Sequence, residues 1–167
     1  GAFQDSAGND FAGLDSSTPD TGMRFTTEPP DIVAPTITSI SPTLNATDIG
    51  INTTLDFVFS ENVVDGSGGI IIYDASDNTI IQTIDGSDPQ VNIFDNQVSV
   101  FLLTDLSYNT SFYVNIDAGA FQDRAGNDFA GLDSSTPDTG MRFTTETDST
   151  IPFIIDILPI LNAIDVS

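Results

Sequence analysis

The stretch TLDFVFS at residues 54–60 decides the fold class of this chain. Its large apolar side chains, Leu55, Phe57 and Phe59, stand at every second position. Successive side chains of a β-strand point to opposite faces of the sheet, so this period predicts a strand with one buried face. Helix-period stretches are missing from the sequence. The pattern therefore favours an all-β protein.

Six further segments on either side of this strand are short, apolar or alternating, and bounded by turn-forming residues. Together they predict a seven-stranded antiparallel β-sandwich in about 115 residues. Because the sequence contains no Cys and no Trp, Phe must fill the core, and we expect Phe57, Phe59, Val100 and Phe112 to be buried. Tyr113 is predicted to point outward. The six segments are TITSI (36–40), GIIIYD (69–74), TIIQTID (79–85), QVSVFLL (97–103), SFYVNID (111–117) and MRFTT (141–145).

The chain repeats itself over the length of a small domain. Residues 1–28 return at 119–146 with one difference, Ser6 against Arg124, and SPTLNATDIG at 41–50 returns in altered form as LPILNAIDVS at 158–167. A spacing this long fits whole domains in tandem. The predicted organisation is a C-terminal fragment of one repeat (1–28), a complete repeat with its linker (29–146) and an N-terminal fragment of the next (147–167).

The two fragments are too small to bury a core of their own. Each holds one predicted strand, at 23–27 and at 152–158, and a lone strand exposes unpaired backbone edges. We therefore expect both strands to pair with another chain or with the next segment of an array.

Composition excludes several classes of function. The net charge is −22, from 25 acidic and 3 basic residues, so nucleic acid and anionic lipid are unsuitable partners. The absence of Cys and His removes disulfides, zinc sites and Ser-His-Asp catalysis. The sequence contains no run of about 20 apolar residues, so no segment of it is predicted to insert into a membrane. A divalent cation is the simplest partner for this charge.

Several segments in this order resemble the bacterial Ig-like domains of S-layer proteins and giant surface adhesins. The matching motifs are Phe-Ser-Glu at 59–61, Asp-x-Ala-Gly-Asn at 123–127 and Phe-Thr-Thr at 143–145. The resemblance covers the complete repeat and, through the copies, both fragments. It implies an extracellular, cell-surface or secreted protein with a structural or adhesive role and no catalysis.

The predicted strand order places the linker and three loops at one end of the sandwich, and acidic residues are concentrated there. Clustered carboxylates with nearby amide oxygens suit Ca²⁺, which takes six to eight oxygen ligands in proteins. We predict a calcium site at this end. The alternative is that Asp and Asn side chains only bond the backbone of their own turns. The candidate ligands are Asp31, Glu61, Asp117, Asp123, Asn127 and Asp128.

The leading functional hypothesis is a structural spacer repeat of a long bacterial surface protein, an adhesin or fibre, stiffened by calcium. Its partners would be neighbouring repeats or subunits. Two alternatives stay open: a filament subunit completed by a neighbour's strand, and a module that binds glycan or protein through the loop at 117–139. A glycosidase pair of carboxylates would need aromatic cleft walls, which this chain without Trp does not offer.

Overall fold

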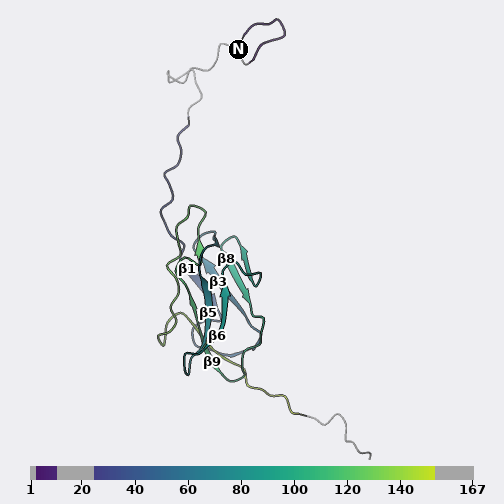
Figure 1. Cartoon of the computed structure of the whole chain (residues 1–167), viewed down its shortest axis with the longest axis vertical. Coiled ribbons are helices and arrows are strands. Elements are labelled where there is room, and N and C mark those ends of the chain that lie inside the picture. Colours follow the sequence, from purple (N-terminus) through teal and green to yellow (C-terminus); the bar gives the residue numbers. More distant parts are fainter. Residues whose placement is uncertain (1–2, 11–24, 153–167) are drawn as a thin grey trace, which may run out of the picture. The chain divides into compact units, whose positions relative to one another are not determined.

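The computed structural model describes residues 3–10 and 25–152 (Figure 1). The chain divides into two compact units, Gly1–Asp31 and Ile32–Ser167. The described part of the first unit contains a tight turn whose ends meet in a β-bridge between Gln4 and Asp10. The second unit contains the sandwich. Among the described residues, no helix is long and apolar enough to cross a membrane.

The described residues of the second unit form three sheets. One sheet has the order β1-β3-β8-β7, the other main sheet has the order β2-β11-β9-β5-β6, and β4 and β10 form a short third pair. Figure 1 labels strands of both main sheets, and the core lies between them. The strands are β1 (Ile37–Ser41), β2 (Ala46–Ile49), β3 (Thr54–Phe59), β4 (Val64–Asp65), β5 (Gly69–Asp74), β6 (Ile80–Asp85), β7 (Val91–Phe94), β8 (Gln97–Phe101), β9 (Ser111–Ile116), β10 (Phe121–Gln122) and β11 (Met141–Thr145).

The predicted all-β class is confirmed, and each of the seven predicted strands has a counterpart: β1, β3, β5, β6, β8, β9 and β11. Four short strands were not predicted, namely β2, β4, β7 and β10. β7 lies outside the seven predicted segments, and its partner β8 pairs with it antiparallel. Two-residue and four-residue strands carry too little alternation to be recognised, because their pairing is decided by the neighbouring strand.

One strand pair departs from the predicted antiparallel arrangement. β1 pairs with β3 in the first sheet, and after Pro42 the chain crosses to the second sheet, where β2 runs parallel to β11. The crossing is closed by the Asn45 N–H, which donates to the Arg142 carbonyl at 2.7 Å. Since β2 continues in the direction of β1, it meets the last strand of the domain in parallel.

The predicted core residues are buried. Phe57 and Val100 are fully enclosed, and Phe59 and Phe112 are each 1% exposed. Phe59 packs edge-on against two rings from the long segment after β9: Phe121, with 5.5 Å between ring centroids, and Phe129, at 5.2 Å. Such edge-to-face pairs stabilise a core beyond the area they bury. The segment after β9 therefore belongs to the core.

Tyr113, predicted to point outward, is nevertheless a buried residue, although it is not part of the core cluster. Its ring is buried because Tyr73 stacks on it, with 4.7 Å between centroids, and the Arg142 guanidinium carbon lies 5.1 Å from the ring centroid. The Tyr113 hydroxyl donates to the Asn78 side-chain oxygen at 3.0 Å. Burial raises the pKa of Tyr113. Alternation indicated the correct face of the sheet, but the side chains of neighbouring strands cover it.

The predicted end strands fall largely outside the described residues. This holds for positions 23–24 and for 153–158, and residues 25–28 form no strand. The pairing of the end strands with another chain or repeat stays a prediction.

Candidate functional site

Two loops at one end of the sandwich are tied together by backbone hydrogen bonds. We call this end the entry end, because β1 begins there beside the end of β3. Gly66 N–H donates to the Ala120 carbonyl at 3.0 Å, and Ser67 N–H donates to the Gly119 carbonyl at 2.7 Å. A β-carbon on Gly66 would lie 2.2 Å from the Gly119 carbonyl oxygen, so this approach requires glycine. The loop after β3 and the segment after β9 thus meet, as the strand order predicts.

Two of the predicted metal ligands in the second unit lie close together at the entry end. One carboxylate oxygen of Glu61 lies within 4.8 Å of one of Asp123. Glu61 is half-buried and Asp123 is 3% exposed, while Asp31 is an exposed residue of the first unit. Two negative charges at this separation repel each other, and the repulsion is strongest where water is excluded. A cation between them would relieve it.

Asp123 is held in place by the turn that it begins. Its two carboxylate oxygens accept from Asn127, one from the backbone N–H at 2.8 Å and the other from the side-chain amide at 2.7 Å. Gly126 completes the turn with a φ of +91°, which favours glycine. The Asn127 side-chain bond lowers the pKa of Asp123, while burial opposes the shift. Asp123 therefore has both the turn-forming role and a place in this pair of carboxylates.

The same turn forms in the first unit from the repeated sequence. Asp5 accepts from the Asn9 backbone N–H at 2.9 Å and from the Asn9 side-chain amide at 2.8 Å. The Asn9 side chain likewise lowers the pKa of Asp5. Asp5 is exposed, in contrast to Asp123. The turn is thus encoded by its own residues, whereas the burial of Asp123 depends on the sandwich around it.

Three further predicted ligands of the second unit lie outside this pair of carboxylates. The Asp117 carboxylate accepts from the Gly69 N–H at 3.0 Å and fixes the start of β5. Asp128 is exposed and forms a β-bridge with Gln122. The Asn127 side chain directs its nitrogen at Asp123. These contacts give Asp117, Asn127 and Asp128 structural roles at the entry end.

Removing the Asn127 side chain is expected to raise the pKa of Asp123 toward that of an ordinary aspartate. A pKa that is lower in the folded state stabilises the fold above the unfolded pKa, and this contribution is lost as the pH falls through the folded pKa. As the pH falls, Asn127→Ala should therefore lose this contribution to stability at a higher pH than the wild type does. Carboxyl-carbon NMR titration in chelator measures the shift. Asn92→Ala, on the exposed side of β7, is the control, and an unchanged Asp123 pKa in Asn127→Ala would contradict the assignment.

The segment at 117–140 is anchored on the domain by several buried side chains. Phe121 and Phe129 are buried in the core, and Ser134 is fully buried. The Ser134 hydroxyl donates to the Val114 carbonyl at 2.6 Å and accepts from the Met141 N–H at 2.9 Å. Sequence reasoning missed Ser134, because one Ser in a polar run carries no signal of burial.

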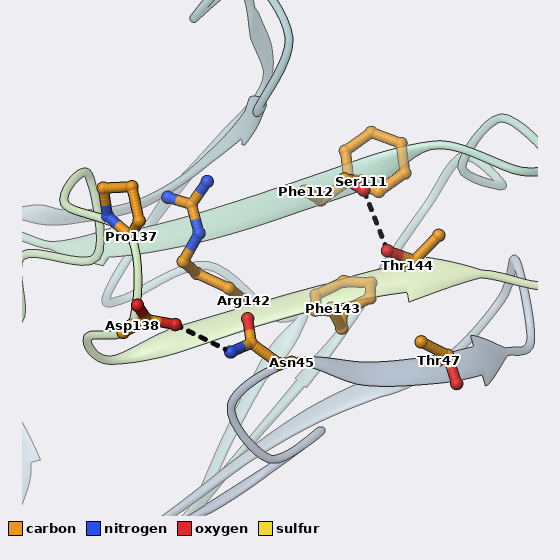
Figure 2. Close-up of a pocket in the computed structure, with 9 residues that line it drawn as sticks. All are labelled: Asn45, Thr47, Ser111, Phe112, Pro137, Asp138, Arg142, Phe143 and Thr144. Atoms are coloured by element: carbon orange, nitrogen blue, oxygen red, sulfur yellow. Dashed lines mark hydrogen bonds between the residues drawn. The ribbon is translucent and has the colours of Figure 1, made fainter.

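A shallow groove crosses the outer side of β9, β11 and β2 (Figure 2). In it the Asn45 amide donates to the Asp138 carboxylate at 3.1 Å, and the Ser111 and Thr144 hydroxyls lie 2.8 Å apart. In these contacts, polar side chains of the groove bond to one another and link neighbouring segments of the chain. The lining residues are Asn45, Thr47, Ser111, Phe112, Pro137, Asp138, Arg142, Phe143 and Thr144.

Comparison with known proteins adds one match. The family described as "Bacterial Ig-like domain" matches residues 31–145, well over half of the chain. No curated protein and no solved structure matches the chain. The matched range includes Asp31, Glu61 and Asp123 as well as the whole sandwich. Domains of this family are structural modules that commonly recur as repeats of bacterial surface proteins. The chain belongs to the bacterial Ig-like domain family.

Proposed function

We propose that this chain is a segment of a repetitive extracellular stalk, in which each Ig-like repeat is a spacer without catalytic activity. The observation that carries the proposal is the path of the chain through the second unit. β1 begins at the entry end, while the residue after β11, Glu146, lies at the other end, where its carbonyl accepts from Asn109 N–H at 2.8 Å. Domains entered and left at opposite ends can be joined into a long array, and the repeated sequence supports such an array.

The parallel pair of β2 and β11 suits a stalk that is pulled from its ends. Force applied to the two ends of the domain would draw β2 and β11 in opposite directions along their length. The hydrogen bonds between them would then be loaded together. These bonds include contacts at both ends of the pair. Asn45 N–H donates to the Arg142 carbonyl at 2.7 Å, and Glu146 N–H donates to the Ile49 carbonyl at 2.8 Å.

Pulling the full chain by its termini tests the spacer function. We expect one force peak per folded repeat, followed by a release of about 40 nm, since an extended chain spans at most about 3.3–3.6 Å per residue over the matched domain. Single-molecule force spectroscopy measures both quantities. Smooth extension without a peak would contradict the proposal. Saturable binding of glycans, with no mechanical resistance, would favour the binding-module alternative instead.

We also propose that Ca²⁺ binds at the entry end and stiffens the start of the domain. The close approach of Glu61 and Asp123 supports this proposal, because the two carboxylates come from different loops of the domain. A cation held by both would fix these loops to each other. Backbone carbonyls and water would have to complete the six to eight ligands of Ca²⁺.

Calcium is expected to raise the melting temperature of the second unit. A ligand at 100 times its dissociation constant stabilises the folded state by about 2.7 kcal/mol, which corresponds to a shift of roughly 10 °C for a domain of this size. Calorimetry with calcium and with chelator measures the shift. Glu61→Gln should abolish it, whereas Asp105→Asn, at an exposed acid after β8, should not. Coincident melts of the wild type would leave these acids as turn formers only.

A further inference from the structure

β6 (Ile80–Asp85) is the outermost strand of the five-stranded sheet. It pairs with β5 on one side, and no strand among the described residues pairs with its other side. Two large apolar side chains on it are exposed to solvent, Ile80 at 55% and Ile81 at 41%. An edge strand of this kind presents backbone donors and acceptors as a template for another strand.

The edge strand carries one charged side chain, Asp85 at its end, in a highly acidic chain. Residues 79–84 contain no charged side chain, and neither do 89–94 and 96–104, which contain β7 and β8. The Gln82 amide donates to the Thr104 carbonyl at 2.9 Å, so the end of this second uncharged segment lies beside β6. Edge strands are commonly protected from pairing by charged side chains or Pro. β6 contains no Pro, and its one charged side chain, Asp85, stands at its last position.

We propose that β6 is a docking edge for β6 of a second copy of this chain. The two strands would pair antiparallel about a two-fold axis and join the two five-stranded sheets into one. The distribution of charge favours a second copy of the chain over a cationic partner at this strand. With a net charge of −22, two copies repel each other wherever acidic faces meet, and the uncharged residues 79–84 are where they can approach closely. A cationic partner would instead be drawn to the acidic surfaces. The contact would join neighbouring stalks side by side, which goes beyond the spacer function.

Sedimentation of the full chain over a concentration series tests the association. We expect a reversible monomer–dimer equilibrium that strengthens with added salt, because screening weakens the repulsion between the acidic faces. The Debye length falls from about 30 Å at 0.01 M to about 3 Å at 1 M ionic strength. A monomer at all concentrations and salt levels would overturn the proposal.

Variants that place a charge on β6 test whether this strand, and not another surface, forms the contact. Ile81→Glu should weaken the dimer at least about tenfold, because like charges meet across the paired strands. Leu44→Glu, at a residue of similar exposure (37%) in the β1–β2 connection, should leave the dimer unchanged. Thermal melts check that each variant is folded, and Thr83→Glu on the same strand replaces Ile81→Glu if that variant does not fold. A dimer that withstands the β6 variants, or that is weakened equally by Leu44→Glu or by Phe94→Glu on β7, would overturn the assignment to β6.

Discussion

Replacing Phe57 by Ala is expected to lower the free energy of unfolding of the second unit by about 3–5 kcal/mol. Phe57 lies in β3, between Ile40 of β1 and Val98 of β8 in the register of the sheet. Its side chain is fully enclosed among the other buried side chains of the core. The surrounding strands relax only in part around the space left by the ring, so the variant loses the transfer free energy of the ring and also bears the cost of a cavity.

Denaturant melts of the wild type and of Phe57→Ala measure this loss. Phe94→Ala removes the same atoms from a side chain on β7 that is 71% exposed, and it should change stability by no more than about 0.5 kcal/mol. A loss below about 1 kcal/mol for Phe57→Ala, or equal losses for the two variants, would show that the enclosed face of β3 is assigned incorrectly.

The sequence could predict those strands whose own side chains carry a period of two. β3 has an apolar side chain at every second position, and its burial pattern follows that alternation without exception. β9 shows the limit of the same reasoning. Tyr113 follows the pattern as an outward residue, yet Tyr73 and Arg142 cover it. Covering of this kind depends on strands that are distant in the sequence.

The candidate site was predictable to a similar degree. The turn from Asp123 to Asn127 recurs from Asp5 to Asn9 with the same hydrogen bonds, so a short local sequence is sufficient for it. Which acids approach Asp123 is decided by the sandwich, which brings Glu61 to it. A strand order indicates the end of the domain at which a loop lies. It does not distinguish Glu61 from Asp117, which bonds the β5 backbone instead.

Replacing Ser134 by Ala is expected to destabilise the second unit by about 2–6 kcal/mol, a large effect for the loss of one oxygen atom. The Ser134 hydroxyl serves two backbone groups, the Val114 carbonyl of β9 and the Met141 N–H of β11. Both groups are in buried residues, and each would lose this partner. An unsatisfied buried polar group costs about 1–3 kcal/mol. Water has little access, since Ser134 is fully enclosed.

Equilibrium unfolding of Ser134→Ala and of Ser135→Ala makes the comparison within one turn. Ser135 is exposed, and its backbone N–H, which Ala retains, donates to the Asp133 carboxylate at the surface, so Ser135→Ala should change stability by no more than about 0.5 kcal/mol. Hydrogen exchange at the Met141 amide should accelerate only in Ser134→Ala, because that amide loses its acceptor there. If the two variants were equally stable, the segment at 117–140 would be held by its buried rings and its backbone hydrogen bonds without help from Ser134. The buried hydroxyl would then contribute nothing to the joining of β9, β11 and the long segment between them.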